Sequence, residues 1–300
     1  MLIAGTVVPM VTPTTGRDGT VDEPSLARYT EHLVTNGVHG LFPCGSIGEF
    51  SSLTHDQRKR VVETAVDAAD GVPVLAGCGD TSVAAVNRHV RTAAEAGADA
   101  AVVVTPYYLS TTQDGLTDFY TDVATDAGLP IVLYNIPALT GAKLDVETVV
   151  ELGENANIVG MKDTSGDMTY HRRLIEETPD GFGVLQGSTE LAVTSLDAGA
   201  DGIIAGPANV FPGVLADVYD AHHSGDRDRA VELMNTVVNP VLTATSDLPT
   251  AAALKYLLTL TECETGAPLP PLPQLDDSEQ QALRRCYRRA TDGYNVTSRA

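Results

Sequence analysis

The amino-acid sequence predicts an α/β protein with the architecture of a (β/α)8 TIM barrel and a C-terminal helical extension. Short apolar runs of strand length recur eight times, and amphipathic helical stretches lie between them. The runs are apolar on both faces, as expected for parallel strands that helices cover. A closed barrel fits better than an open doubly wound sheet, because no Gly-x-Gly-x-x-Gly turn follows the first run.

The predicted elements alternate regularly along the first two thirds of the chain. We expect strands at Ile3–Val8, Gly40–Cys44, Val72–Ala76, Ala100–Thr105, Ile131–Tyr134, Ile158–Met161, Gly183–Gln186 and Gly202–Ala205. Among the helices between them, we expect Glu23–Thr35, Thr54–Ala69, Ser82–Ala96, Gly115–Asp126 and Asp145–Leu152. A glycine precedes several strands, and glycine is the usual stop of a helix.

The last part of the chain has no strand pattern. We expect helices there at Gly213–His222, Asp226–Thr245, Thr250–Thr261 and Ser278–Thr291. The proline-rich stretch Pro268–Pro273 is interpreted as a rigid spacer rather than as a ligand for another protein. The expected domains are a catalytic barrel, residues 1–211, and a helical extension, residues 212–300.

Composition excludes several classes of partner. The chain has 300 residues, with 40 acidic against 19 basic side chains and a net charge of −21, so nucleic acids and anionic membranes would repel it. Acidic excess, scarce lysine and absent tryptophan suggest adaptation to high salt, which screens the self-repulsion. We see no signal peptide and no apolar run of spanning length, and we expect a cytoplasmic protein.

The cysteines do not suggest a metal site. The four of them, Cys44, Cys78, Cys263 and Cys286, have no metal-ligand spacing. Cys44 and Cys78 end apolar runs and are expected to be buried as small hydrophobic residues.

One lysine is placed where chemistry is expected. Lys162 ends the apolar run that begins at Ile158, in a chain with only three other lysines, Lys59, Lys143 and Lys255. An amine can lose its proton and attack a carbonyl, whereas a guanidinium stays charged. The first hypothesis is therefore a Schiff base on Lys162, and the structural alternative is a lysine that reaches solvent.

Other predicted strand ends carry polar groups, and in a barrel these ends meet at one mouth. Gly45-Ser46-Ile47-Gly48-Glu49 follows the second strand, and its backbone N–H groups could bind an anion, although most such segments are tight turns. Tyr108 follows the fourth strand and Tyr134 ends the fifth. A tyrosine there is either a packing residue or a group that transfers protons. His171, Arg172 and Arg173 are interpreted as solvated surface rather than as a phosphate site.

These motifs together resemble the pyruvate-dependent class I aldolases of the N-acetylneuraminate lyase and dihydrodipicolinate synthase family. The resemblance covers nearly the whole chain. It is carried by Gly45-Ser46-x-Gly48-Glu49, Tyr134-Asn135-x-Pro137 and Gly160-x-Lys162-x-Thr164, in this order.

The resemblance implies a role for each matching residue. Lys162 would form the Schiff base with a 2-keto acid, and Tyr134 would be the general acid and base. Ser46, with Tyr108 of a neighbouring subunit, would complete the proton relay. The backbone of Ser46 and Ile47 would hold the carboxylate. The remaining residues implied at the substrate are Gly45, Leu139, Thr164, Gly187, Thr189 and Glu190. The covalent Schiff base would need no cofactor and no metal.

The departures from the family pattern concern the substrate. Dihydrodipicolinate synthases carry an arginine two residues after the proline of Tyr-Asn-x-Pro, where it grips a second carboxylate, and here that position is Leu139. Thr189 stands where the sialate lyase branch usually has Asp. Ile47 replaces the usual hydroxyl residue, so its side chain cannot bind the carboxylate.

The expected function is therefore that of a carbon–carbon lyase, an aldolase that cleaves 2-keto-3-deoxygluconate reversibly to pyruvate and glyceraldehyde. The expected assembly is a homotetramer, a dimer of dimers, of a salt-adapted organism. The alternatives are N-acetylneuraminate lyase, dihydrodipicolinate synthase and a keto-deoxy sugar-acid dehydratase. A non-catalytic regulator that binds a 2-keto acid is disfavoured, because such a binder needs no nucleophile.

Overall fold

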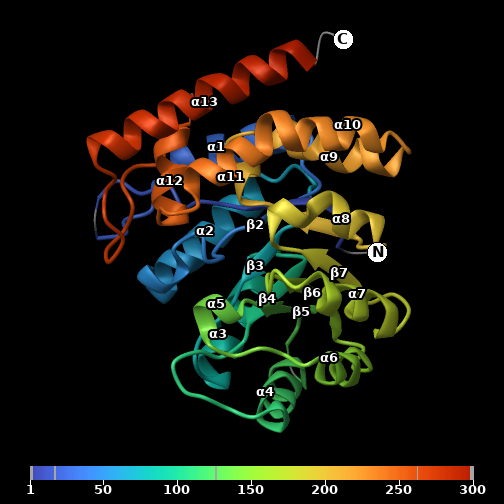
Figure 1. The fold of residues 1–300 in the computed structure, drawn as a ribbon. Coiled ribbons are helices and arrows are strands. Elements are labelled where there is room, and N and C mark those ends of the chain that lie inside the picture. Colours follow the sequence, from blue (N-terminus) through green and yellow to red (C-terminus); the bar gives the residue numbers. More distant parts are fainter. Residues whose placement is uncertain (1–2, 17, 126, 262, 298–300) are drawn as a thin grey trace.

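The computed structural model describes residues 3–16, 18–125, 127–261 and 263–297, and it confirms the barrel. Eight parallel strands pair in the order β2-β1-β8-β7-β6-β5-β4-β3 (Figure 1). A parallel bridge between Leu41 and Val74 joins the two outer strands and closes the ring. The strands are β1 (Gly5–Pro9), β2 (Gly40–Phe42), β3 (Leu75–Gly77), β4 (Ala100–Val104), β5 (Ile131–Asn135), β6 (Ile158–Asp163), β7 (Gly183–Gln186) and β8 (Gly202–Ile204).

Two strand boundaries differ from prediction in an informative way. Strand β3 begins at Leu75 rather than Val72, because Pro73 has no N–H group to donate to a neighbouring strand. Strand β6 continues beyond Met161 through Lys162 and Asp163. The strand was predicted to end where the apolar residues end. Because the polar side chains of Lys162 and Asp163 are also buried, the strand continues past that point.

Helices cover the outside of the ring. They are α1 (Glu23–Thr35), α2 (His55–Asp67), α3 (Val83–Glu95), α4 (Gln113–Thr125), the short α5 (Pro137–Thr140), α6 (Val146–Gly153), α7 (Met168–Glu177) and α8 (Ala192–Asp197). Their starts follow from capping side chains: Asp22 caps α1, Thr54 forms a capping box with Gln57 at α2, and Ser82 caps α3. The predicted last residue of α4, Asp126, lies outside the described residues.

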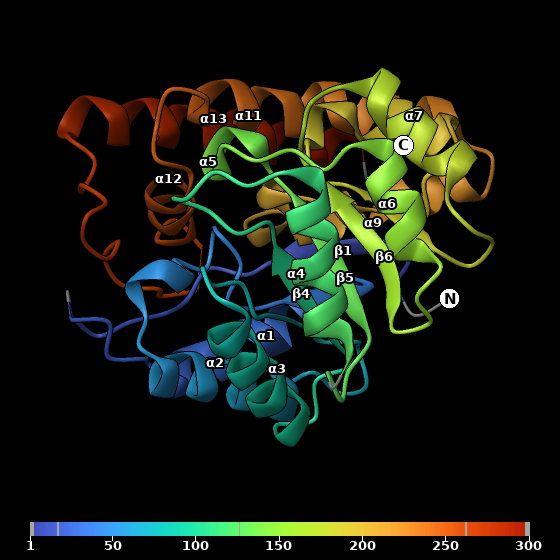
Figure 2. The ribbon, with the colours of Figure 1, turned by 90° about the horizontal axis from the view of Figure 1, so that it is seen from below.

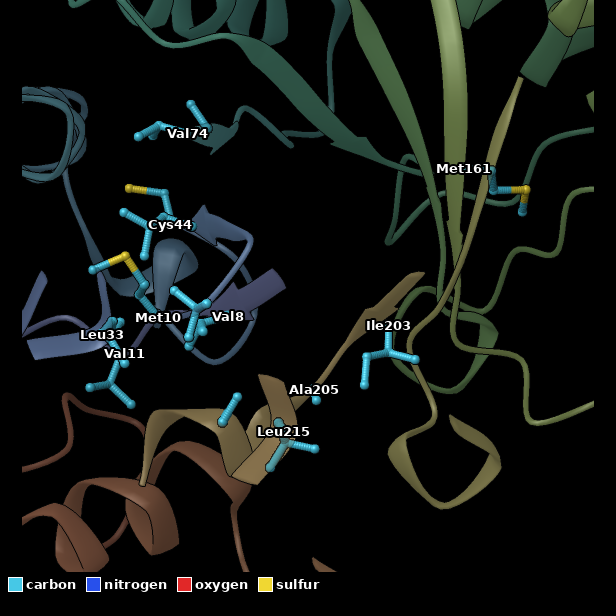
Figure 3. Close-up of a cluster of buried hydrophobic side chains, with 14 of the residues drawn as sticks. Val8, Met10, Val11, Leu33, Cys44, Val74, Met161, Ile203, Ala205 and Leu215 are labelled. Carbon is cyan, nitrogen blue, oxygen red and sulfur yellow. The ribbon is translucent and has the colours of Figure 1, made fainter. Parts of the chain in front are cut away.

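The core has two layers. One fills the barrel interior with side chains such as Val7, Phe42 and Leu185. The other lies between the strands and the helices, where Cys44 and Cys78 are buried as predicted. Figure 3 shows part of this outer layer, in which Val8 of β1, Cys44 and Leu215 are drawn among other buried side chains.

The extension is helical, as predicted, and packs against the barrel. It contains α9 (Pro212–His223), α10 (Arg227–Leu233), a π-helical turn (Met234–Val238), α11 (Asn239–Thr245), α12 (Thr250–Leu258) and α13 (Asp277–Thr297). The helix predicted over Asp226–Thr245 is present as one continuous helical run from Arg227 to Thr245. A π-helical turn interrupts its regular hydrogen-bond ladder just before Pro240, which has no N–H group to donate. Helix α13 lies alongside α11 (Figure 2).

A helix that crosses a lipid bilayer must be long and apolar. None of the described helices, in the ranges given above, is both long enough and apolar enough to cross a membrane.

Candidate active site

A cavity of about 560 Å³ opens at the carboxyl ends of the strands. Nine of the eleven residues predicted for the site line it: Ser46, Ile47, Tyr134, Leu139, Lys162, Thr164, Gly187, Thr189 and Glu190. They come from segments as far apart as the end of β2 and the turn after β7. The fold therefore brings together residues that the sequence separates by more than a hundred positions.

Lys162 and Tyr134 face each other in this cavity. They are register partners on β6 and β5, and their side chains are only 5% and 4% exposed. The Lys162 Nζ atom lies 4.1 Å from the centre of the Tyr134 ring and 5.0 Å from that of Phe42. The amine therefore lies against two aromatic rings, which shield it from much of the solvent.

Gly187 makes room for the neighbours of this amine. A Cβ atom at Gly187 would lie 2.0 Å from Thr164 Oγ1 and 2.9 Å from Lys162 Cε, so any side chain there would displace both. The Thr164 Oγ1 atom is buried and has no hydrogen-bond partner among the described residues. A hydroxyl group left without a partner beside an amine is a candidate ligand contact.

The segment after β2 is tightly constrained. Thr12 donates a hydrogen bond from Oγ1 to the Gly48 carbonyl at 2.8 Å, and a Cβ atom at Gly48 would lie 2.9 Å from the Met10 carbonyl oxygen. Glu49 adopts a left-handed conformation with φ of 57°, and its N–H donates to the Ser46 carbonyl at 3.1 Å. This geometry brings Ser46 and Ile47 to the cavity.

Gly45 lies outside the main cavity. It lines a neighbouring space of about 10 Å³ together with Ser46 and Tyr134, among others. That volume is close to the room that one water molecule needs.

A buried ion pair anchors the same segment to the extension. The Lys255 Nζ atom on α12 lies 2.6 Å from Glu49 Oε1, and both side chains are 1% exposed. Lys255 also donates to the Ala267 carbonyl at 3.1 Å, and the Leu269 N–H donates to Glu49 Oε2 at 2.5 Å. Burial lowers the pKa of Lys255, and the Glu49 carboxylate opposes that shift. The stretch Pro268–Pro273 is therefore more than a spacer, since it holds Glu49 in place.

Removing the cation of this pair should destabilise the protein strongly. We expect Lys255→Met to cost about 3–5 kcal/mol, because it leaves the buried Glu49 carboxylate uncompensated. The urea midpoint at fixed salt and protein concentration measures the effect. Lys59→Met is the matched control: its pair with Glu63 is exposed, so about 0.5 kcal/mol or less is expected. Equal midpoints for the two variants would contradict the prediction.

The extension also supplies part of the cavity wall, which sequence reasoning missed. Helix α12 and the segments beside it contribute a mostly apolar wall: Leu242, Thr245, Leu248, Pro249, Thr250, Ala251, Leu254 and Leu272. One feature of the sequence could have pointed to a role for the extension. Lys255 lies in it, and lysine is as unusual there as it is at position 162, because the chain has only four lysines.

Tyr108 does not line its own chain's cavity. It lies beyond β4 with φ of 79°, and its side chain is 92% exposed. The adjacent Leu109 is also exposed. Leu139, in contrast, lies at the rim of the cavity and is 66% exposed.

The interpretation of His171 as solvated surface is wrong. Helix α7 turns its side chain inward, where it is fully buried against Asp163 and Ser195. Arg172 and Arg173 do lie on the surface, paired with glutamates. The sequence alone predicted that all three residues lie near the start of a helix. It did not show that His171 faces the protein interior while Arg172 and Arg173 face solvent.

The charges around the cavity are few. Of the described residues that line it, Lys162 alone has a cationic side chain and Glu190 alone a carboxylate. Over the described ranges, no group of three or more histidine, cysteine, aspartate or glutamate side chains is arranged to hold a metal ion.

A parallel barrel with a buried lysine at its mouth is the architecture of the pyruvate-dependent lyases. The model of the dihydrodipicolinate synthetase family matches residues 2–290. The chain therefore belongs to this family, whose enzymes form a Schiff base between pyruvate and a lysine and use no metal.

Individual relatives agree with this assignment. The 4-hydroxy-tetrahydrodipicolinate synthase of Methanopyrus kandleri is 37% identical over 288 residues, 94% of this chain and 95% of the relative. A DapA-like lyase of Halobacterium salinarum that is described as uncharacterised is 37% identical over 278 residues, 92% and 91% of the two chains. Among solved structures, the Escherichia coli K12 prophage protein YagE, in complex with pyruvate, is 32% identical with a TM-score of 0.92 over 97% of this chain and 99% of that one.

Proposed function

We propose that this chain is a class I aldolase that cleaves 2-keto-3-deoxygluconate, or a close 2-keto-3-deoxy sugar acid, reversibly to pyruvate and glyceraldehyde. The observation that carries the proposal is the charge of the cavity wall. Of the described lining residues, only Lys162 is cationic, and this amine is the one that the covalent step consumes.

The proposed reaction uses the residues in the following roles. The backbone N–H groups of Ser46 and Ile47 bind the carboxylate of the keto acid. The Lys162 amine attacks the C2 ketone, and loss of water gives an iminium ion. Tyr134 takes the proton of the C4 hydroxyl as the C3–C4 bond breaks, which releases the aldehyde. The bonding electrons enter the iminium to form an enamine, and protonation at C3 and hydrolysis then release pyruvate.

The rest of the wall suits an uncharged, hydroxylated aldehyde. Thr189, Glu190 and Thr250 line the cavity, so their oxygens can bind hydroxyl groups. Leu139 offers no partner for a second carboxylate, and Glu190 would repel one. We propose Thr164 and Gly187 as further contacts at the reacting end, since they lie beside Lys162.

A second candidate is dihydrodipicolinate synthase. Relatives that are 34–38% identical bear the name 4-hydroxy-tetrahydrodipicolinate synthase, and this similarity favours aspartate semialdehyde as the aldehyde. The two candidates share the pyruvate step and differ only in the second substrate.

A condensation assay separates the two candidates. Pyruvate is offered in high-salt buffer with D-glyceraldehyde, N-acetylmannosamine or aspartate semialdehyde. We expect the highest kcat/KM with glyceraldehyde. We also expect Leu139→Arg to raise kcat/KM for aspartate semialdehyde by about 10-fold or more, because a hydrogen bond to a charged group is worth about 1.5–3 kcal/mol. Leu139→Met is the matched control and should leave the preference unchanged. A wild-type preference for aspartate semialdehyde would overturn the aldolase proposal.

We further propose that the protein is a cytoplasmic homotetramer of a salt-adapted organism. The exposed Tyr108 and Leu109 supply an apolar contact for a neighbouring subunit, and Tyr108 could then join Ser46 and Tyr134 in a proton relay. The net charge of −21 supports adaptation to salt. We also propose that the chain has two domains, a catalytic barrel, 1–211, and a helical extension, 212–300. Sedimentation in high salt would report the assembly.

A further inference from the structure

A chain of buried hydrogen bonds runs outward from the wall of the barrel. Asp163 accepts from Asn135 Nδ2 at 3.1 Å on one oxygen and from His171 Nδ1 at 3.1 Å on the other. His171 Nε2 in turn lies 2.7 Å from Ser195 Oγ. All four side chains are fully buried, and they come from β5, β6, α7 and α8.

The carboxylate at the centre of this network is fully satisfied. The backbone N–H of Ser165 donates to Asp163 Oδ1 at 2.9 Å, and its hydroxyl donates to Oδ2 at 3.1 Å. A carboxylate only accepts, so the proton between Asp163 and His171 is on Nδ1. In the neutral imidazole, Nε2 is then the acceptor for the Ser195 hydroxyl.

Ser195, His171 and Asp163 are the residue types of a hydrolytic catalytic triad, but their surroundings do not suit one. A nucleophilic serine must reach its substrate and have donors aimed at the developing oxyanion. Ser195 is fully buried, so a substrate cannot approach it. The network therefore needs another explanation.

The position of the network behind Tyr134 and Lys162 suggests a role in holding these two residues in place. Tyr134 pairs with Lys162 across β5 and β6, and the next register pair is Asn135 with Asp163. Because side chains alternate along a strand, the first pair faces the cavity and the second faces the helices. The Asn135–Asp163 hydrogen bond thus ties the two strands directly behind the two residues that would do the chemistry.

The far end of the network lies on the helix that follows a second part of the cavity wall. Ser195 belongs to α8, which directly follows the turn Thr189–Leu191. Thr189 and Glu190 in that turn line the cavity. One line of hydrogen bonds therefore connects the strands of Tyr134 and Lys162 with α8, the helix that follows the turn proposed to bind the aldehyde.

We propose that Asn135, Asp163, His171 and Ser195 form a positioning network that holds Tyr134, Lys162 and the Thr189–Leu191 turn in a fixed relation for pyruvate chemistry. The inference rests on the proposed roles of Lys162 and Tyr134, and not on the identity of the aldehyde. A displacement of about 1 Å in a reacting group can slow a reaction by about 10²-fold, so a rigid support matters to rate as well as to stability.

The test compares three variants that remove different parts of the network. His171→Leu removes both bonds of the imidazole. His171→Asn places an amide near the position of Nδ1, so it can still donate to Asp163 but cannot reach Ser195. Ser195→Ala removes only the outer hydroxyl. Borohydride trapping of pyruvate counts the competent sites, and exchange of the C3 protons of pyruvate in D2O gives the rate of enamine formation per competent site.

We expect each trapped site to exchange more slowly, by about 10²-fold in His171→Leu and by about 3–10-fold in His171→Asn and Ser195→Ala. The KM for pyruvate should change little. A purely structural role would lower the unfolding midpoint and leave exchange per trapped site at the wild-type value in all variants, which overturns the proposal. Should His171→Leu fail to fold, wild-type exchange rates in both other variants would overturn it equally.

The same experiment distinguishes this inference from the proposed function. Exchange needs pyruvate but no aldehyde, so an error in the choice of aldehyde leaves the test intact. A wild-type protein that does not trap pyruvate on Lys162 would overturn the proposed function and the positioning network with it.

Discussion

Lys162→Ala should abolish turnover and also pyruvate-dependent borohydride trapping. The amine is proposed to form the covalent bond to the substrate, and it lies 4.1 Å from the Tyr134 ring centre in a cavity that holds no other cationic side chain among its described lining residues. Loss of a nucleophile lowers kcat on the order of 10⁶-fold in enzymes where it has been removed. Mass spectrometry after borohydride treatment with pyruvate measures the trapped adduct.

Two controls make this result specific. Lys162→Arg keeps a cation in the cavity but should trap nothing, because a guanidinium does not lose its proton. Lys143→Ala removes an exposed lysine and should trap pyruvate like the wild type. Lys255 cannot replace Lys162, since it is buried against Glu49. An adduct that persists in Lys162→Ala would show that another amine carries the chemistry.

Tyr134→Phe should still trap pyruvate but turn over about 10²–10⁴-fold more slowly. That range is typical of the loss of a general acid or base. The change removes only a hydroxyl, so the ring keeps its edge contact with Phe42, whose centre is 6.2 Å away, and its place beneath the Lys162 amine. Steady-state kinetics alongside trapping separates the two effects.

Tyr120→Phe is the matched control for this prediction. Tyr120 is also a buried tyrosine, but its hydroxyl donates to the Val103 carbonyl at 3.1 Å and does not line the cavity. We expect lower stability and nearly normal turnover. A Tyr134→Phe variant that is as active as Tyr120→Phe would remove Tyr134 from the proposed proton transfer.

The barrel was predictable because its signals are local. Apolar runs of strand length and capping residues such as Thr54 act within a few positions, so the eight strands were found close to their true bounds. The mouth of the barrel followed from a rule of topology, since parallel strands bring Ser46, Tyr134 and Lys162 to one end. The end of β6 was missed because Asp163 is polar and yet buried.

The parts that escaped prediction depend on contacts between distant segments. His171 is polar and was therefore expected at the surface. Its hydrogen bonds with Asp163 and Ser195 explain why it is buried. Likewise, the apolar wall around Leu254 and Leu272 belongs to the extension, whose packing against the barrel leaves no pattern in the sequence. Such contacts become visible only when the whole fold is known.

The ion pair between Glu49 and Lys255 has a consequence for the order of assembly during translation. Glu49 leaves the ribosome long before Leu269, which donates a hydrogen bond to it from 220 positions further along the chain. Until then, the segment that carries Ser46 and Ile47 lacks the partners that hold its left-handed turn. A nascent chain can form its strands before that moment, but it completes the cavity only after Leu269 has been made.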